Sequence, residues 1–453
     1  MCCQMSDTLI VSVSGVRGIV GTSLTPEVVE RYATAFGILI REAGGSTAVL
    51  ARDARASGPM FANVVRTALM SAGVSVIDCG LIPTPTAQLA VEHHGAAGGI
   101  VITASHNPVE WNALKFVGQD GLFLNREAAN RLFEVAAQPT REAKVVPGDT
   151  IDDAAAVERH LDAVLGLELL DAVSIRRRRF TVALDCVRGA GGTIMPRLLN
   201  RLGCHTVGMD LETDGMFPRL PEPVPENLSG LGELVRQVGA DLGIAVDPDV
   251  DRLAVVDETG TPIGEDYTLA FAVREVLPRR AGVVVTNLST SLVVDDAARE
   301  HNAVVRRAPV GEANVAALMK QVGAVIGGEG NGGVMLPDLH LGRDAPVAAG
   351  LVLSLLARSG RSVSEVVRAA PHYSIVKAKV ELRGSMEGVY RSLERRFPDA
   401  SLDRQDGLRL SWSDSWLHVR PSGTEPIVRF IAEAPSDEAA HNLARIAQEY
   451  MSS

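Results

Sequence analysis

The chain has 453 residues and a formal net charge of −11, and these figures already exclude several classes of protein. A length of this order predicts about three or four domains. A hydrophobic content of 46% with 22% charged residues excludes global disorder. The acidic balance argues against nucleic acid as the main partner. No apolar run approaches ~18 residues and no signal-like segment opens the chain, so we expect a cytoplasmic protein without membrane association.

Apolar strand-like runs alternate with helix-compatible stretches, which is the pattern of an α/β protein. Six of these runs end in a loop of small or polar residues, and they fall into three pairs. The pairs lie at residues 46–58 and 98–108, at 179–192 and 240–252, and at 281–291 and 322–333. Buried strands that end in polar loops are where open α/β sheets bind their ligands. The recurrence predicts three similar α/β units with mixed sheets.

Breaks in this pattern divide the chain into domains. The polar stretch at residues 138–153 indicates a linker, and further breaks lie near 257–264 and 359–373. The last stretch has the pattern of a strand, a helix, two short strands and a helix, which predicts a C-terminal domain of α+β type. We therefore expect four domains, at residues 1–150, 151–257, 258–370 and 371–453.

The strongest single motif is the acidic turn at residues 247–252. Asp247, Asp249 and Asp251 stand at every second position, and a proline holds the turn. Three carboxylates so placed direct oxygens at one hard cation such as Mg²⁺. A solvated acidic turn explains the motif poorly, because apolar strands flank the loop directly and would crowd three like charges at a sheet edge. An EF-hand is disfavoured as well, since Arg252 occupies the position that needs glycine.

The loop TASHNP follows the apolar strand at residues 98–102. Its Ser105 fits a nucleophile, a phosphate carrier or a helix cap, and a hydrolase is disfavoured because the G-x-S-x-G elbow is missing. Taken alone, His106 indicates a local hydrogen-bonding residue. Lys115, ten residues beyond Ser105, and Arg17, between two glycines near the N-terminus, would each be ordinary surface charges if they stood alone.

Two further loops have the composition of ligand sites. In GGEGNGG the glycines let backbone approach a ligand, and Glu329 and Asn331 suit paired sugar hydroxyls; a flexible glycine turn is the alternative. In RPSGTEP two hydroxyls, backbone N–H groups and flanking arginines make a phosphate cradle. An ordinary turn would leave both Arg420 and Arg429 unexplained.

Taken together and in this order, the loops closely resemble the α-D-phosphohexomutase superfamily. The most specific motifs are TASHNP, DPDVDR, the glycine-rich loop and RPSGTEP, and the resemblance runs from Ser14 to about Ala434. The segments SGVRGIVG, WNALK, GGEGNGG and LGRDA look like the branch assigned as phosphoglucosamine mutase in some bacteria and archaea. The family implies four domains around a central cleft, with one loop from each.

The resemblance also implies a role for each residue near the transferred group. Ser105 would be the phosphoserine that donates and recovers a phosphoryl group, with glucosamine or glucose 1,6-bisphosphate as intermediate and activator. Mg²⁺ would be held by an oxygen of phosphorylated Ser105 and by Asp247, Asp249 and Asp251. The transfer site would be lined by Arg17, His106, Lys115 and Arg252. Among these, Lys115 is our candidate base, because arginines and Mg²⁺ around its ammonium would depress its pKa.

The same resemblance assigns the rest of the substrate to the last two loops. The sugar hydroxyls would be bound by Glu329 and Asn331. The phosphate remote from transfer would be gripped by Arg420, Ser422, Gly423, Thr424 and Arg429.

The leading prediction is an enzyme that interconverts glucosamine 6-phosphate and glucosamine 1-phosphate. The same chemistry on mannose or glucose phosphates is the alternative, although many members with that activity carry a serine and a final histidine where this chain has Asn331 and Gly333. A non-catalytic sugar-phosphate-binding regulator and a metal-dependent phosphatase are more remote alternatives. The expected partner is a small phosphosugar, and a monomer and a homodimer fit the sequence equally.

Overall fold

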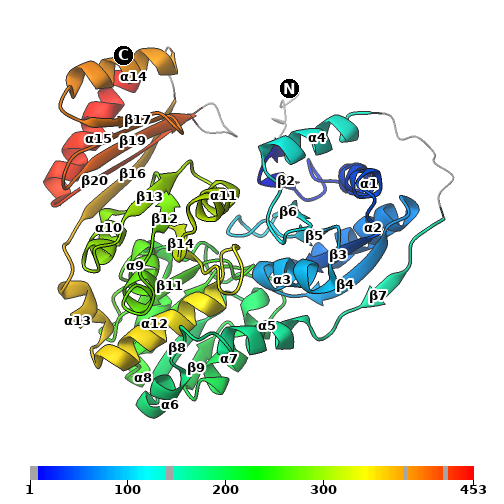
Figure 1. The fold of residues 1–453 in the computed structure, drawn as a ribbon, viewed down its shortest axis with the longest axis horizontal. Coiled ribbons are helices and arrows are strands. Elements are labelled where there is room, and N and C mark those ends of the chain that lie inside the picture. Colours follow the sequence, from blue (N-terminus) through cyan, green and yellow to red (C-terminus); the bar gives the residue numbers. More distant parts are fainter. Residues whose placement is uncertain (1–8, 139–145, 382–384, 422–426, 453) are drawn as a thin grey trace, which may run out of the picture.

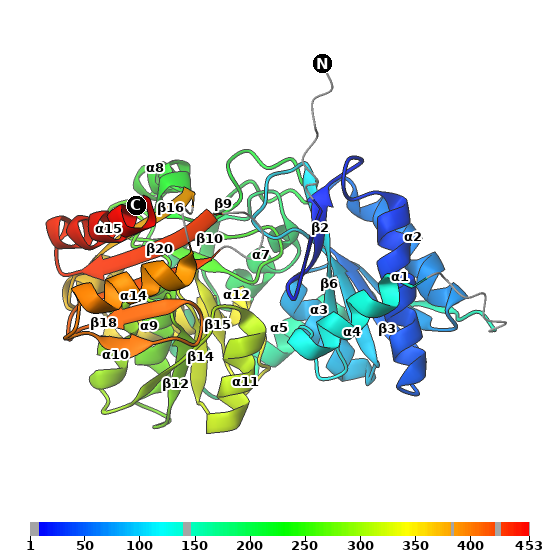
Figure 2. The same cartoon turned by 90° about the horizontal axis from the view of Figure 1, so that it is seen from above.

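The computed structural model describes residues 9–138, 146–381, 385–421 and 427–452. Its strands form four sheets, and each sheet is the centre of one domain (Figure 1). The first domain (blue to cyan) and the fourth (orange to red) lie on opposite sides of the molecule in two perpendicular views (Figure 1 and Figure 2). The third domain (green to yellow) lies between them.

The first domain contains a seven-stranded sheet. Its strands are β1 (Ile10–Ser12), β2 (Gly15–Ile19), β3 (Thr47–Arg52), β4 (Ser75–Leu81), β5 (Gly98–Ile102), β6 (Trp111–Gly118) and β7 (Thr150–Asp152), in the order β1-β2-β6-β5-β3-β4-β7. Its helices are α1 (Pro26–Glu42), α2 (Gly58–Ser71), α3 (Thr84–His94) and α4 (Arg126–Ala136). Strand β7 lies inside the stretch that the sequence indicated as a linker. Its side chains are exposed, so it pairs with β4 through backbone alone and leaves no apolar pattern.

The second domain contains a four-stranded sheet. Its strands are β8 (Thr181–Asp185), β9 (His205–Met209), β10 (Leu242–Val246) and β11 (Leu253–Val256), in the order β11-β10-β8-β9. Its helices are α5 (Ala156–Leu165), α6 (Ala172–Arg178), α7 (Met195–Arg201) and α8 (Ser229–Val238), with short 3-10 turns η1 (Ala190–Thr193) and η2 (Pro225–Asn227).

The third domain contains another four-stranded sheet. Its strands are β12 (Val284–Asn287), β13 (Val305–Ala308), β14 (Ile326–Glu329) and β15 (Gly333–Met335), in the order β13-β12-β14-β15. Its helices are α9 (Asp266–Val276), α10 (Leu292–Arg299), α11 (Glu312–Val322), α12 (Ala345–Ser359) and α13 (Val363–Arg368).

One topology recurs in these three sheets. Strand β3 pairs in parallel with β4 and β5, β8 with β9 and β10, and β12 with β13 and β14. Each time the second inner strand is followed by an antiparallel partner, which is β6, β11 or β15. The first sheet adds β1 and β2 beyond β6, and β7 beyond β4. The prediction of three similar α/β units with mixed sheets is confirmed.

The fourth domain is built on an antiparallel sheet of five strands. They are β16 (Ser374–Glu381), β17 (Ser401–Asp403), β18 (Leu408–Ser411), β19 (Trp416–Pro421) and β20 (Ile427–Ala434), in the order β16-β20-β19-β18-β17. Its helices are α14 (Met386–Arg396) and α15 (Asp437–Ser452). The predicted α+β layout is correct, but the sequence analysis missed β17 and β18, which are only three and four residues long.

Apolar packing joins the first three domains and sets the fourth apart. Val49 of β3, Ile244 of β10 and Ile326 of β14 belong to one continuous cluster of buried side chains. The fourth domain has a cluster of its own, which includes Leu417 and Phe430. The loops of the first three domains are therefore fixed relative to one another by a common core. Within the described ranges, none of the helices combines the length and apolar character needed to cross a membrane.

Polar contacts connect the fourth domain to the third. His418 Nδ1 lies 2.8 Å from the Ser289 hydroxyl, and the backbone N–H of Leu292 donates to Glu433 Oε1 over 2.8 Å. Interfaces of this kind between domains permit relative motion more readily than a shared apolar core does.

Asp266 is a buried carboxyl group near this interface. Its Oδ1 accepts the backbone N–H of Ser291 over 2.9 Å, and a Cβ added to Gly330 would lie 2.1 Å from the same oxygen. Burial raises the pKa of Asp266 to about 7 from an ordinary value of 3.8; the Lys377 ammonium opposes the rise and the Glu265 carboxylate adds to it. The folded state therefore holds a proton on Asp266 well above the pH at which an unfolded chain releases it.

We expect Asp266→Asn to gain stability over the wild-type protein as the pH rises. Because the folded pKa is raised, this residue's contribution to wild-type stability is full below about pH 4 and is lost as the pH climbs to about 7. The amide stays neutral and still accepts from Ser291. In thermal unfolding the advantage of the variant should grow by about 3 kcal/mol between pH 5 and pH 8. A difference that does not change with pH would contradict the assignment.

Candidate active site

Three of the predicted loops occupy the same place in the repeated unit. The serine loop joins β5 to β6, the acidic loop joins β10 to β11, and the glycine-rich loop joins β14 to β15. Each is the turn from the second inner strand into its antiparallel partner. Since the common core fixes the three sheets, these equivalent turns can meet. They do meet. Ser105 of the serine loop contacts Asp247 of the acidic loop, and Arg343 bridges Asp251 of the acidic loop and Glu329 of the glycine-rich loop.

A buried arginine shapes the serine loop. Ser105 has a φ of 48°, in the left-handed region that non-glycine residues rarely adopt. Arg55, 1% exposed, donates to the carbonyl oxygens of Ser105, Asn107 and Pro108, each over 2.7 Å. Asp53 holds Arg55 in turn, with 3.1 Å between Oδ2 and Nε. These bonds maintain a conformation that presents the Ser105 hydroxyl.

The three aspartates of the acidic loop form one buried group whose oxygens lie within 4.8 Å of one another. Asp247 Oδ2 accepts the Ser105 hydroxyl over 2.8 Å, and Asp247 Oδ1 accepts the backbone N–H groups of Asp251 and Arg252. The structure thus brings the predicted phosphoserine and the predicted metal ligands together, although they are far apart in the sequence.

The remaining oxygens of the triad suit a hard cation. Asp249 Oδ2 accepts from Thr84 and Lys115, each over 2.7 Å, and Asp251 Oδ2 accepts from Arg343 over 2.5 Å. The Oδ1 atoms of Asp249 and Asp251 are buried and accept no hydrogen bond from the described residues. Each of these two carboxylates therefore has one oxygen held by protein and one left for a ligand. An all-oxygen set of this kind fits Mg²⁺.

Charge repulsion within the triad appears in its pKa shifts. Burial, followed by the negative charges of Asp251 and Asp249, raises the pKa of Asp247 well above its ordinary value. Burial acts on Asp249 in the same direction, but the Lys115 ammonium and hydrogen bonds outweigh it and lower the pKa of Asp249. The two aspartates thus ionise differently, because the Lys115 ammonium lies 2.7 Å from Asp249, whereas the Arg252 cation offsets the burial of Asp247 only in part.

Lys115 differs from our expectation. It lies on β6, buried, with its Nζ 2.7 Å from Asp249 Oδ2 and 3.7 Å from Asp251 Oδ2. Burial opposes its charge, but the two aspartates outweigh burial and raise its pKa. The predicted depression of this pKa is therefore wrong for this structure, where Lys115 is an ammonium group.

The other predicted residues of the transfer site gather around Ser105. His106 Nδ1 lies 3.3 Å from the Ser105 hydroxyl, and Arg17 donates to the Asn107 side chain over 2.7 Å. Arg252, with burial and Arg17 as lesser causes, lowers the pKa of His106 well below its ordinary value, so the ring is neutral. Arg252 itself donates to Glu222 over 3.1 Å.

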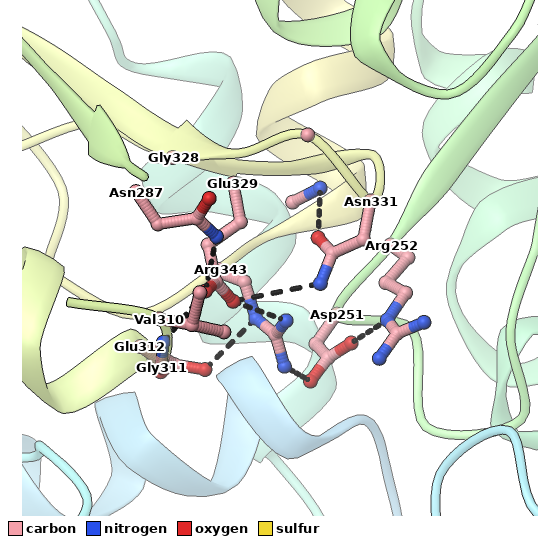
Figure 3. A network of polar contacts seen from close by, with 12 residues as sticks. Asp251, Arg252, Asn287, Val310, Gly311, Glu312, Gly328, Glu329, Asn331 and Arg343 are labelled. Atoms are coloured by element: carbon pink, nitrogen blue, oxygen red, sulfur yellow. Dashed lines mark hydrogen bonds and ion pairs between the residues drawn. The ribbon is translucent and has the colours of Figure 1, made fainter. Parts of the chain in front are cut away.

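Glu329 is held at both of its oxygens (Figure 3). Oε1 accepts from the Asn287 amide over 2.8 Å and from the Gly311 backbone N–H over 3.0 Å. Oε2 accepts from Arg343 over 2.8 Å and from Asn331 over 3.5 Å. Burial opposes the charge of Glu329, but Arg343 and these bonds outweigh it and lower the pKa. The carboxylate is ionised and fixed in place.

Arg420 and Arg429 stand opposite each other on strands β19 and β20 of the fourth domain. Burial lowers the pKa of Arg420; the Asp406 carboxylate opposes this, the Arg429 cation adds to it, and the negative charge of Glu329 also reaches Arg420. The structure therefore places the two predicted phosphate-binding arginines side by side. Ser422, Gly423 and Thr424 lie outside the described residues.

The sequence analysis assigned no role to several residues that position this site. They are Asp53, Arg55, Thr84, Glu222, Asn287, Glu312 and Arg343. All but Asn287 lie in further segments that resemble the family, namely ARDARASG (51–58), IPTP (82–85), PEPVPENL (221–228), PVGE (309–312) and LGRDA (341–345). Those matches were the available signal, but only the fold shows which atoms each residue contacts.

Comparison with known proteins agrees with this arrangement. The chain matches the phosphoglucomutase/phosphomannomutase family in its α/β/α domains I, II and III at residues 9–142, 158–260 and 264–373, and in its C-terminal domain at residues 379–448. A phosphoglucomutase/phosphomannomutase of Thermococcus kodakarensis is 37% identical over 433 residues, which cover 94% of each chain. A probable phosphoglucosamine mutase of Methanopyrus kandleri is 37% identical over 439 residues, which cover 95% of each.

A solved structure supports the same conclusion at the level of the fold. The crystal structure of a phosphoglucomutase/phosphomannomutase family protein from Burkholderia thailandensis superposes with a TM-score of 0.85 at 27% identity, and the match covers 97% of both chains. All four domains, the loop motifs and the overall fold thus agree. The chain belongs to the α-D-phosphohexomutase superfamily and is a phosphohexomutase, an isomerase that moves a phosphoryl group.

Proposed function

We propose that the protein interconverts glucosamine 6-phosphate and glucosamine 1-phosphate through a phosphoserine and a 1,6-bisphosphate. The observation that carries the chemistry is the Ser105 hydroxyl, held 2.8 Å from Asp247 at the edge of a buried triad of carboxylates. An amino sugar is favoured by the segments SGVRGIVG, WNALK, GGEGNGG and LGRDA, which look like the phosphoglucosamine mutase branch. The relative from Methanopyrus kandleri is named a probable phosphoglucosamine mutase.

The alternative substrates are mannose and glucose phosphates. They are supported by the relative from Thermococcus kodakarensis, which is as similar to this chain and is named for both activities. The chemistry is the same for all three sugars, since the hydroxyls that exchange the phosphoryl group are on carbons 1 and 6.

In this proposal the phosphoryl group passes from Ser105 Oγ to the free hydroxyl of the hexose phosphate, which gives a bisphosphate and an unmodified serine. After the sugar turns over, its other phosphoryl group returns to Ser105 Oγ. In the first transfer the proton of the sugar hydroxyl ends on Ser105 Oγ, and His106 Nδ1 lies 3.3 Å from that oxygen, within hydrogen-bond reach of it. Lys115 and Arg252 would place positive charge beside the transferred phosphoryl group. In each of the two transfers this charge would offset the negative charge of the phosphoryl oxygens.

Asp247, Asp249 and Asp251 would hold Mg²⁺ together with a phosphoserine oxygen. When bound, the cation neutralises charge that develops on the transferred phosphoryl oxygens. Arg420 and Arg429, with the predicted Ser422, Gly423 and Thr424, would bind the phosphate that is not being transferred. Because that phosphate is first on carbon 6 and then on carbon 1, this grip has to tolerate both orientations of the sugar.

A comparison of three substrates tests the proposed specificity. We expect kcat/KM for glucosamine 1-phosphate to exceed that for glucose and mannose 1-phosphates by about tenfold or more, on the scale of one ionic hydrogen bond. Higher values for glucose or mannose would establish the alternative. Release of inorganic phosphate without isomerised product would indicate a phosphatase, and binding without turnover would indicate a regulator.

Ser105 should carry the phosphoryl group. We expect part of the purified protein to bear one phosphoryl group, located at Ser105 by peptide mass analysis, and Ser105→Ala to lose isomerisation. Ser71→Ala, at an exposed serine at the end of α2, is the matched control. It should keep both the phosphoryl group on Ser105 and the isomerase activity. Full activity of Ser105→Ala would exclude the mechanism.

The cation site and the distant phosphate site should affect different kinetic constants. Arg420→Ala should raise KM about ten- to a hundredfold, because it removes a charge-assisted bond made throughout the cycle. Asp249→Asn should mainly reduce kcat, since the triad acts on charge that develops during transfer. Steady-state kinetics at saturating Mg²⁺ distinguish the two.

The exposed Arg445→Ala, which breaks a surface pair with Glu449 on α15, is the control for loss of an arginine. It should alter neither constant. An unchanged KM in Arg420→Ala together with an effect of Asp249→Asn on KM alone would refute the division of roles. Activity that survives removal of all divalent cations by a chelator would refute the cation site itself.

A further inference from the structure

Arg343 contacts carboxylates from three separate segments of the chain (Figure 3). Its Nη2 lies 2.5 Å from Asp251 Oδ2, its Nη1 2.8 Å from Glu329 Oε2, and its Nε 3.0 Å from Glu312 Oε2. Its side chain is 9% exposed. All three guanidinium nitrogens are thus used, each on a different carboxylate.

We propose that Arg343 is a positioning residue that sets the geometry of the cation loop and of the sugar loop together. The proposal rests on the proposed function, in which Asp251 is a cation ligand and Glu329 a sugar ligand. Arg343 touches neither the cation nor the sugar in this scheme. Arg343 acts through these two carboxylates, and its Nε is held in place by an ion pair with Glu312.

On the cation side, Arg343 determines which oxygen of Asp251 is available. It occupies Oδ2, while Oδ1 is buried, accepts no hydrogen bond from the described residues and has Arg252 Nε 3.7 Å away. With Oδ2 held, the carboxylate cannot rotate freely, so Oδ1 stays directed into the triad. Partners of this kind, behind the ligands of a metal, typically change its affinity by about ten- to a hundredfold.

On the sugar side, Arg343 completes the set of groups around Glu329. Asn287 and the Gly311 N–H fix Oε1, and Arg343 supplies the positive charge at Oε2. Without that charge a buried carboxylate would lack its ion-pair partner, and its position would no longer be defined. One guanidinium therefore keeps both a predicted cation ligand and a predicted sugar ligand in place.

The geometry requires arginine rather than lysine. A guanidinium presents its N–H groups in a rigid plane, and here they point to three carboxylates in three directions. A lysine ammonium is a single nitrogen on a flexible chain, so it cannot contact all three carboxylates at the same time. Gly333 supports this role, because a Cβ at that position would lie 2.2 Å from Cδ and 2.8 Å from Cγ of Arg343. The absence of a side chain at Gly333 leaves space for the Arg343 side chain.

The decisive variant is Arg343→Lys, which keeps the charge and removes the three-way geometry. Two affinities are measured: Mn²⁺ by electron paramagnetic resonance without any sugar, and glucosamine 6-phosphate by calorimetry. We expect both to weaken by about tenfold or more. The control is Arg274→Lys, which removes a buried guanidinium from its pair with Glu300 between α9 and α10, outside the site. It should leave both affinities unchanged.

A second variant covers the case in which Arg343→Lys does not fold. Gly333→Ala keeps every polar group and displaces Arg343 through the added methyl group, and circular dichroism checks that the chain is folded. It should weaken both affinities as well. Gly230→Ala is its control, because a Cβ at that position on α8 meets only Met209 Cε at 3.6 Å.

The outcomes separate this proposal from the proposed function. Wild-type affinities for Mn²⁺ and the sugar phosphate in folded Arg343→Lys or Gly333→Ala would overturn the role of Arg343, as would loss of only one of the two. Absence of hexose phosphate turnover in the wild type would instead overturn the proposed function, and the Mn²⁺ measurement would still decide whether Arg343 positions the cation loop.

Discussion

The rest of the structure is organised around the enclosure of three carboxylates in one buried space. Asp247, Asp249 and Asp251 lie at the ends of strands that are themselves wholly buried, where like charges repel strongly. Backbone N–H groups, Lys115 and Arg343 each take one oxygen of the group. Three elements supply hydrogen-bond donors or positive charge to these carboxylates. They are the serine loop, the strand β6 that carries Lys115 and the loop before α12 that carries Arg343.

The repeated unit explains how these elements come together. The serine, acidic and glycine-rich loops are one and the same turn in three copies of a sheet. The chemistry of each turn differs, but each follows the equivalent inner strand of its sheet, so packing the sheets against a shared core brings the turns together. The fourth domain has another topology and its own core, and it supplies arginines rather than a fourth such turn.

Much of this arrangement was accessible from the sequence, because its signals are local. The apolar runs before Ser105 and Asp247 predicted buried strands, and the triad predicted a cation site from spacing alone. The short strands β7 and β17 were missed, since exposed edge strands carry no apolar pattern. The pKa of Lys115 was predicted in the wrong direction because its partner Asp249 is 134 residues away, and no local pattern reports such a pairing.

The contacts between the third and fourth domains determine how freely the domain that carries Arg420 and Arg429 can move. Hydrogen bonds such as those of His418 to Ser289 and of Leu292 to Glu433 are replaced by bonds to water when the domains part, and each such exchange costs only about 1 kcal/mol. Parting the first three domains would instead expose a continuous apolar core, at a far larger cost per unit area. The fourth domain can therefore move relative to the third more readily than the first three domains can move relative to one another. In the proposed reaction, this difference would let the sugar reorient while the triad and Ser105 stay in place.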